Sequence, residues 1–417
     1  MLKNYIKIAW KVLLRRKFFT FISLFGISFT LMILMVVTAL FDHVFGSQMP
    51  ERKLDRLLFV NMMKEQGEQY QMSGPPSYYF LNRYVRTLQT PEKVSINSVF
   101  HAVNSYVNNQ KLALDLKYTD QEFWEILDFN FLEGKAYGQQ EVDNASRVAV
   151  INQNTRRQYF GIGEAVGQYI EVDQVKYRVI GVVEDISFLR LNSYADVWVP
   201  VTLNTPNMKR TSLRGEYFAT ILARQASDIP KIKEEYQQMM MHKVEKPTRK
   251  DFKALHSYPD TILESFSRTF LSKGRHGPQD ANLGLLYTIL AGLAFLFMLL
   301  PTINLVNINI SRIMERSSEI GVRKAFGASS TTLIGQFIVE NIFLTLLGGL
   351  LGFVLSAGVL GLINVSGVIT YAGLSLNLRV FAWGLLLCLA FGLVSGVYPA
   401  FKMSKLQAVE ALKGGAK

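Results

Sequence analysis

The segment FFTFISLFGISFTLMILMVVTALF, residues 18–41, decides the fold class, because none of its 24 residues carries an ionisable side chain. As an α-helix it would extend about 36 Å, enough to cross the hydrocarbon core of a bilayer. The 17 residues before it are basic, its apolar core is longer than that of a secretory signal peptide, and no small-residue cleavage site follows. We therefore predict an uncleaved membrane-spanning helix at 18–41.

Three further segments share this character, since residues 281–311, 341–378 and 380–401 contain no Asp, Glu, Lys, Arg or His. The core helix of a soluble protein rarely needs more than about 18 such residues. The middle segment is too long for one simple span, and its second half is rich in glycine and β-branched residues. We predict four transmembrane helices with an outer loop at 365–379; the helices occupy 18–41 (TM1), 283–310 (TM2), 333–364 (TM3) and 380–401 (TM4).

The distribution of charge predicts the orientation of these helices. Residues 1–17, 311–330 and 402–417 together carry 14 Lys and Arg against three Glu, which is nearly all of the net charge of +12. Positively charged loops stay on the cytoplasmic side of a membrane. Both termini and the 311–330 segment are therefore expected inside, and residues 42–280 outside. Because the outer region is close to neutral, the basic composition indicates topology and no nucleic-acid partner.

Residues 42–280 alternate strand-like and helix-like segments without a regular βαβ repeat, which favours an α+β domain inserted between the first two spans. The two borders of this domain should pack together near the membrane, so that the middle, about 105–215, forms an inserted subdomain. The expected strands are 57–63, 94–103, 111–118, 147–151, 168–172, 177–183, 197–201 and 217–223. The expected helices are 77–88, 120–127, 152–159 and 229–242.

The sequence offers no catalytic, cofactor-binding or metal site. A single cysteine, Cys388, excludes a disulfide within the chain and a multi-cysteine metal site. The five histidines are scattered and form no metal-binding spacing. No nucleophile motif or paired-carboxylate pattern stands out. We expect no enzyme activity in this chain.

The most informative cytoplasmic stretch is ISRIMERSSEIGVRKAFGASSTTLIGQFIVE, residues 310–340. Glu319 and Arg323 have the favourable i,i+4 order on a helix, and Gly327 offers a helix end. The pattern predicts a short amphipathic helix beneath the membrane. The residue pattern alone leaves open whether this helix only lies at the interface or docks a cytoplasmic partner.

Several motifs resemble the permease domain of FtsX/MacB-type ABC transporters. The cytoplasmic and C-terminal motifs are ERSSEIGVRKAFGAS (315–329), QFIVENIFLTLLGGLLG (336–352) and GLVSGVYPAFKMSKLQAVEALKGG (392–415). The N-terminal IAWKVLLRRKFFTFISLFGIS (8–28) is similar to the first span of that family and its approach. The outer motifs are FNFLEGKAY (129–137), SRVAVINQNTRRQYFG (146–161) and VGQYIEVDQVKYRVIGVVEDI (166–186). The resemblance covers nearly the whole chain.

The resemblance implies a permease subunit of the cytoplasmic (inner) membrane, paired with a second permease as a homo- or heterodimer and bound to cytoplasmic ATPases. ATP hydrolysis there would move the outer domain, and ATP and Mg²⁺ would bind to the ATPase. Efflux of peptides or drugs, lipoprotein extraction and activation of a cell-wall hydrolase all fit, as does a periplasmic adaptor or other envelope protein as a further partner. The 311–330 segment would be the coupling helix; its carried-over residues are Glu315, Arg316, Glu319, Ile320, Gly321, Arg323, Lys324 and Gly327.

One departure from the family concerns the ATPase, which some members carry fused at the N-terminus. The phosphate-binding pattern G-x-x-x-x-G-K-[ST] is absent, and the only Gly-Lys pair, Gly134–Lys135, is followed by Ala136. A phosphate cradle needs that lysine together with successive backbone N–H groups. We expect the ATPase to be a separate chain.

Small residues four apart in the third and fourth spans indicate close helix packing, within the subunit or across a dimer. These are Gly348 and Gly352 in the third span and Gly392 and Gly396 in the fourth. Because polar side chains are scarce in the spans, we expect this subunit to transmit force rather than to line a hydrophilic path. The alternative is a membrane-anchored sensor or scaffold that regulates a cell-envelope enzyme without transport. A neighbouring gene for an ATPase would favour the transporter, and one for a histidine kinase the sensor.

Overall fold

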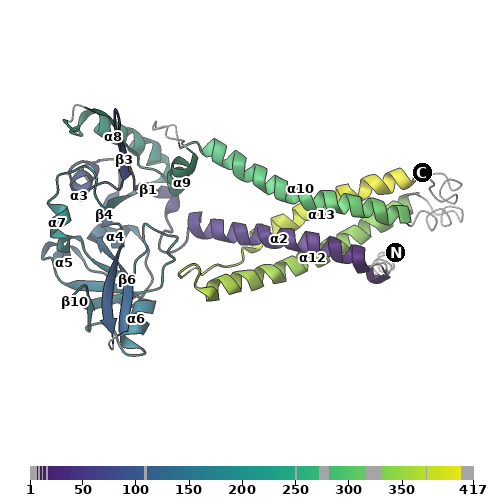
Figure 1. Ribbon diagram of the computed structural model, residues 1–417, viewed down its shortest axis with the longest axis horizontal. Helices are drawn as coiled ribbons and strands as arrows, with labels where there is room; N and C mark the ends of the chain where they lie inside the picture. The colour runs from purple at the N-terminus through teal and green to yellow at the C-terminus, as the bar shows by residue number, and fades with distance from the viewer. Residues whose placement is uncertain are drawn as a thin grey trace. The chain divides into compact units, whose positions relative to one another are not determined.

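The computed structural model describes two compact units. The described residues are 7, 10, 11, 13–15, 17–107, 110–248, 251–271, 281–315, 330–371 and 373–404. The helical unit contains residues up to 41, 287–366 and from 374 onward; the globular unit contains residues 42–286 and 367–373. Figure 1 shows the long helices of the first and the sheet of the second.

Four long helices supply the helical unit: α2 (Lys17–Phe45), α10 (Leu283–Glu315), α12 (Ser330–Ser366) and α13 (Leu378–Ser404). Among the described residues, two stretches are both long and apolar enough to cross a bilayer, namely α2 and the Ile338–Ser366 part of α12. Shorter apolar stretches occupy Leu283–Phe297 of α10 and Leu378–Ala390 of α13. The last turn of α2 and the first turn of α10 belong to the globular unit.

Inside the helical unit, α2 packs on α12 and α13. Ile27 and Leu31 of α2 and Leu344 of α12 are almost completely buried in one apolar cluster. Phe353 of α12 meets Phe381 of α13 edge to face, with ring centroids 4.9 Å apart. Glu340 of α12 is buried as well, so this carboxyl faces the interior of the unit rather than lipid.

A ten-stranded mixed sheet forms the centre of the globular unit, in the order β1-β12-β4-β6-β11-β8-β10-β7, with β5 added on β6 and β9 on β10. The pairs β6–β11 and β8–β10 are parallel. The strands are β1 (Leu57–Val60), β4 (Lys93–Ser98), β5 (His101–Val107), β6 (Gln110–Thr119), β7 (Phe131–Gly134), β8 (Val148–Asn152), β9 (Tyr169–Val172), β10 (Val175–Val183), β11 (Val197–Pro200) and β12 (Tyr217–Leu222).

A smaller antiparallel sheet has the order β13-β2-β3, from β2 (Met63–Gly67), β3 (Gln71–Gly74) and β13 (Phe252–Ser257). Within the residues that the structure describes, six short helices lie between strands: α3 (Tyr78–Phe80), α4 (Gln121–Ile126), α5 (Gln139–Asp143), α6 (Gln153–Phe160), α7 (Thr205–Met208) and α8 (Ile229–His242). A seventh, α9 (Ile262–Leu271), follows β13.

Local sequence signals explain where several helices begin. The Asp120 carboxylate accepts a hydrogen bond from the N–H of Phe123 at 3.1 Å and caps α4. The Asn152 side chain accepts from the N–H of Thr155 at 2.8 Å and caps α6 in the same way. Such caps satisfy backbone donors that have no partner inside the helix.

All eight expected strands of the α+β domain are present, with two corrections. Of the four expected helices, three are α-helices, and the expected helix 77–88 is the three-residue α3 followed by a π-helical segment at Leu81–Val85. The segment 94–103 is two strands, because β4 pairs with β12 and β5 pairs with β6. The segment 57–63 likewise divides between β1 and β2, which belong to different sheets. Alternation of apolar residues marks a strand but not the point at which the chain changes partner. Strands from both sides of 105 and 215 share one sheet, so those subdomain boundaries stay a prediction.

Candidate functional site

The expected coupling residues lie at the end of α10 and in the segment that follows it, most of which is outside the described residues. Glu315 is the last residue of α10, and its side chain lies outside the described residues. The other seven expected coupling positions lie outside the described residues altogether: Arg316, Glu319, Ile320, Gly321, Arg323, Lys324 and Gly327. Their docking role therefore stays a prediction.

Two of the four expected packing glycines have a described environment. A Cβ added at Gly348 would lie 2.7 Å from the Ile27 side chain, and one at Gly352 would lie 3.0 Å from the Leu31 Cβ and from the Ser28 carbonyl oxygen. Both glycines thus allow α12 to approach α2 closely within one subunit. Gly392 and Gly396 lie in α13, but their surroundings are outside the described residues.

The globular unit contains a second candidate site that sequence reasoning missed. The ten residues Ser187–Asp196 between β10 and β11, here called the hub loop, form a largely buried connection. Connecting segments normally run over the surface, because buried backbone polar groups need partners. Side chains from distant parts of the chain supply those partners.

Arg190 of the hub loop holds the end of α2. Its guanidinium Nη2 donates to the carbonyl oxygens of His43 at 2.9 Å and Gly46 at 3.0 Å. These are carbonyls of the kind that a helix C-terminus leaves without partners. Nη1 donates to Glu51 Oε2 at 3.0 Å, and Ser193 Oγ donates to Glu51 Oε1 at 2.9 Å. We call this group the Arg190 clamp.

Burial makes the Arg190 clamp a fixed arrangement. The side chains of Arg190 and Glu51 are 2% and 0% exposed. Removing one charge from such a pair leaves the other uncompensated, typically at about 3–5 kcal/mol. Arg190 therefore fixes where the chain leaving α2 enters the globular unit.

Lys117 supports the hub loop from strand β6. Its Nζ donates to the carbonyl oxygens of Leu191 at 2.9 Å and Asn192 at 2.7 Å. Burial lowers the pKa of Lys117 to about 7, while the Glu51 charge acts in the opposite direction. The ammonium group is thus held in the interior by two carbonyls and one neighbouring carboxylate.

Aromatic and acidic groups complete the hub loop. The Phe188, Tyr194 and Phe100 rings pack edge to face, with centroids 5.3–5.6 Å apart. The Tyr194 hydroxyl donates to Asp115 Oδ2 at 2.8 Å, and burial raises the pKa of Tyr194. Asp196 accepts from the backbone N–H of Asp115 at 2.9 Å. The loop is consequently tied to the central sheet.

The end of α2 also contacts α9, the helix that precedes α10 in the described part of the chain. Phe45, the last residue of α2, packs edge to face on Phe266 of α9 with centroids 5.2 Å apart. Arg268 of α9 donates to both carboxylate oxygens of Asp260, at 2.7 and 2.9 Å. The Phe45–Phe266 pair thus brings together residues near the two borders of the globular unit; the expected position of this contact near the membrane stays a prediction.

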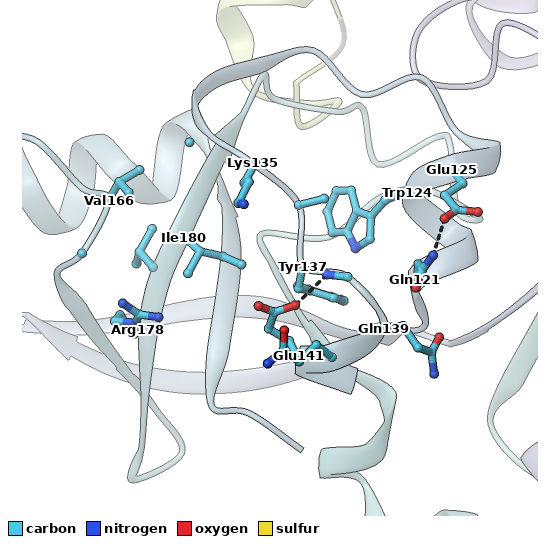
Figure 2. Close-up of a pocket in the computed structure, with 16 residues that line it drawn as sticks. Gln121, Trp124, Glu125, Lys135, Tyr137, Gln139, Glu141, Val166, Arg178 and Ile180 are labelled. Atoms are coloured by element: carbon cyan, nitrogen blue, oxygen red, sulfur yellow. Dashed lines mark hydrogen bonds between the residues drawn. The ribbon is translucent and has the colours of Figure 1, made fainter. Parts of the chain in front are cut away.

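A cleft of about 1010 Å³ opens beside the edge strand β7. Figure 2 shows Lys135 and Arg178 toward one side of it and Trp124 and Glu125 toward the other. Glu125 also pairs with Lys93 at 2.5 Å. Because acidic and basic side chains balance along its walls, the cleft does not indicate a ligand class. Among the described residues, no three His, Cys, Asp or Glu side chains gather as metal ligands.

Sequence reasoning missed the hub loop because its charged residues carry no motif. Glu51, Lys117 and Arg190 stand far apart in the sequence, and a charged residue in a polar loop is normally solvated. The only available signal was the unusually apolar surroundings of Arg190 in the run ISFLRLNSYADVWV.

Two family models match the chain. The MacB-like periplasmic core domain matches residues 20–239, which is more than half of the 417 residues. The FtsX-like permease C-terminal domain matches residues 291–408.

Named relatives agree with these matches. The macrolide export ATP-binding/permease protein MacB of Bdellovibrio bacteriovorus is 30% identical over 67% of this chain and 41% of its own length. The pyoverdine export ATP-binding/permease protein PvdT of Pseudomonas syringae is 23% identical over 98% of this chain and 59% of its own. The uncharacterized ABC transporter permease YvrN of Bacillus subtilis is 25% identical over 76% of this chain and 72% of its own. The chain thus spans 41–59% of the two export proteins.

Proposed function

This chain belongs to the MacB/FtsX family of ABC transporter permeases, and from that membership we propose that it transmits the work of a cytoplasmic ATPase to its globular unit. The ATPase is a separate chain that binds ATP and Mg²⁺. The motion drives export or extraction of a substrate, such as a peptide, drug or lipoprotein, from the outer side of the membrane. The names of two relatives refer to macrolide and pyoverdine export, which supports a small or peptide-like substrate.

The proposal includes a membrane arrangement. The helices α2, α10, α12 and α13 each cross the inner membrane, both termini and residues 311–330 lie in the cytoplasm, and the globular unit lies outside. The excess of Lys and Arg in the three inner segments supports this orientation. Two permeases associate, and residues 311–330 of each contact one ATPase.

The Arg190 clamp is the observation that carries the proposal. Helix α2 is continuous from Lys17 to Phe45, and its last turn is held by a buried guanidinium through two carbonyl oxygens and a buried carboxylate. A continuous helix with a fixed end transmits a tilt or shift of its other end, whereas a flexible linker would absorb it. A scaffold that only anchored a sensory domain would not need this joint.

The scarcity of polar groups also supports transmission of force. Residues 18–41 and 341–366 carry no ionisable side chain, and Glu340 is buried inside the helical unit. A hydrophilic path needs polar lining. The substrate therefore stays outside while the helices move.

The test follows the motion without a substrate. In a Cys388→Ser background, nitroxide labels are placed on Lys176→Cys, on β10, and Leu350→Cys, on α12; both sites are exposed. The protein is purified with the ATPase that accompanies it, and label distances are measured with and without ATP, Mg²⁺ and vanadate. We expect the distance distribution to shift with nucleotide. An unshifted distribution in a hydrolysing complex, or purification without any ATPase, would favour the sensor or scaffold.

A further inference from the structure

The segment Gly367–Gly373, between α12 and α13, groups with the globular unit although both helices that it connects belong to the helical unit. We infer that this segment is a third joint between the membrane helices and the globular unit, in addition to the Arg190 clamp and the Phe45–Phe266 contact. The hydroxyl of Tyr371 fastens it. The inference rests on the proposed function, because a joint matters only if motion passes through it. We call residues 367–373 the Tyr371 loop.

Hydrogen bonds hold two residues of the Tyr371 loop: Tyr371 through its hydroxyl and Thr370 through its backbone carbonyl. The Asn154 Nδ2 donates to the Tyr371 hydroxyl at 2.8 Å, and the hydroxyl donates to Asp196 Oδ1 at 3.2 Å. The backbone N–H of Phe188 donates to the carbonyl oxygen of Thr370 at 3.2 Å. The Tyr371 ring also packs against the main apolar core of the globular unit. These contacts join the loop to α6 and to both ends of the hub loop.

The groups that receive Tyr371 are themselves fixed. Asp196 Oδ1 also accepts from Asn152 Nδ2 at 2.8 Å, and the backbone N–H of Asn154 donates to Asp185 Oδ1 at 2.7 Å. Burial raises the pKa of Tyr371 above its usual value, so the hydroxyl keeps its proton and remains a donor at physiological pH. Ionisation of Tyr371 therefore does not break these hydrogen bonds at physiological pH.

The backbone of the Tyr371 loop is strained at the anchor. Tyr371 has φ +54°, in the left-handed region, and Gly367 and Gly373 at the two ends have φ +68° and +54°. Glycine adopts this conformation without cost, but a tyrosine does not. Strained backbone persists only where the surrounding contacts determine it. The bonds of the Tyr371 hydroxyl supply that determination, which a passive external loop would not need.

The hub loop connects this third joint with the first. Arg190 holds the end of α2, and Phe188 and Asp196 hold the Tyr371 loop. The three hub residues lie within nine positions of each other. Motion of α2 and motion of the α12–α13 pair therefore act on the same short element of the globular unit. Through the Tyr371 loop, the hub loop responds to motion of α12 and α13 as well as to motion of α2.

The experiment removes a single oxygen atom. Tyr371→Phe keeps the ring in the core but loses both hydrogen bonds. Tyr169→Phe is the matched control, because Tyr169 is exposed on β9. Hydrogen exchange is measured on the full chain in nanodiscs. We expect exchange at the Phe188 amide to rise at least tenfold in Tyr371→Phe and to stay unchanged in Tyr169→Phe.

The functional readout is the nucleotide-dependent distance between labels at positions 176 and 350. We expect Tyr371→Phe to reduce the shift by at least half while ATP hydrolysis continues.

Three outcomes decide the matter. Unchanged exchange at the Phe188 amide in Tyr371→Phe would overturn the anchor, and faster exchange with an unchanged distance shift would overturn its role as a joint. If the wild-type complex itself shows no nucleotide-dependent shift, the proposed function fails, and the exchange result alone then reports on the anchor.

Discussion

Lys117 has a wholly buried amino group, and this burial makes the stability of the globular unit depend on pH. Its pKa in the folded chain is about 7, against about 10.4 in an unfolded chain. Between these values the unfolded state binds more protons, so the free energy of unfolding rises as pH increases. Below pH 7 both states are protonated and the full cost of burying the charge remains.

We predict that raising the pH from 7 to 9 increases the free energy of unfolding by about 2 kcal/mol through Lys117. Urea unfolding of the detergent-solubilised protein, followed by tryptophan fluorescence, measures this. Lys117→Met should flatten the pH dependence, and Lys176→Met, at an exposed lysine on β10, should preserve it. An equal pH slope in Lys117→Met and wild type would contradict the prediction.

Individual residues also mark the limit of what sequence can reveal. Asp120 and Asn152 were recognisable as helix starts, because capping depends on neighbours in the sequence. Arg190, Glu51 and Lys117 were not, because each depends on a partner more than 70 positions away. Tyr371 was likewise hidden, since the left-handed backbone at that residue follows from its tertiary contacts.

Helix α12 contains glycines with opposite surroundings, which provides a test of packing. A Cβ at Gly352 would press on the backbone and Leu31 of α2, whereas one at Gly358 would meet nothing within 4 Å. We predict that Gly352→Val lowers the apparent melting temperature by several degrees, as overpacking typically costs about 1–3 kcal/mol. Gly358→Val should leave it unchanged, since it has the same helix and the same change in side chain. Equal melting temperatures for both variants would contradict close α2–α12 packing.

The segment between α10 and α12 carries the predicted coupling helix. We predict that Glu319→Arg and Arg323→Glu each uncouple ATP hydrolysis from the label distance shift while the permease still inserts, because a docking surface loses its charge complementarity. The double exchange distinguishes the two readings of this helix. It should remain uncoupled if the two residues contact the ATPase, and unchanged coupling in both single variants would leave only the interfacial helix.

Among the elements, strand positions were predictable because burial on one face imposes alternation. The elements that the sequence did not reveal include short ones, such as β3, β7 and α5, and also the six-residue β13 and the ten-residue α9. The split between β4 and β5 arises from a change of pairing partner, which no local pattern encodes. The order of the ten-stranded sheet could not be predicted for the same reason.

At the level of the whole chain, the predicted topology can be tested by labelling. Single cysteines at Lys176 and Ser329, in a Cys388→Ala background, report the globular unit and the predicted cytoplasmic segment. We predict that a membrane-impermeant maleimide labels position 176 on whole cells, with the outer membrane permeabilised if there is one, and labels position 329 only after the cells are opened. Equal labelling, or labelling at 329 alone, would reverse the orientation.

The division into a helical and a globular unit follows from composition, since apolar blocks and a mixed-polarity middle separate clearly in the sequence. What composition could not show is that residues 367–373 return to the globular unit. Sequence analysis treated them as part of a plain outer loop at 365–379. Long-range contacts of a seven-residue segment leave no periodic signal.

The central claim is that the Arg190 clamp passes helix motion to the globular unit. The direct measurement is the nucleotide-dependent distance between labels at positions 176 and 350 in the double variant Arg190→Met with Glu51→Gln. Removing both charges leaves neither member of this ion pair buried without its partner, and Lys117 keeps its two carbonyl acceptors. The control is Arg83→Met with Glu245→Gln, which removes an ion pair of the same 3.0 Å length whose side chains are 53% and 72% exposed.

We predict that the Arg190→Met/Glu51→Gln variant folds and its complex hydrolyses ATP, but that the distance shift seen in wild type is lost, while the control variant retains it. A folded Arg190→Met/Glu51→Gln variant with the full wild-type shift would contradict the account.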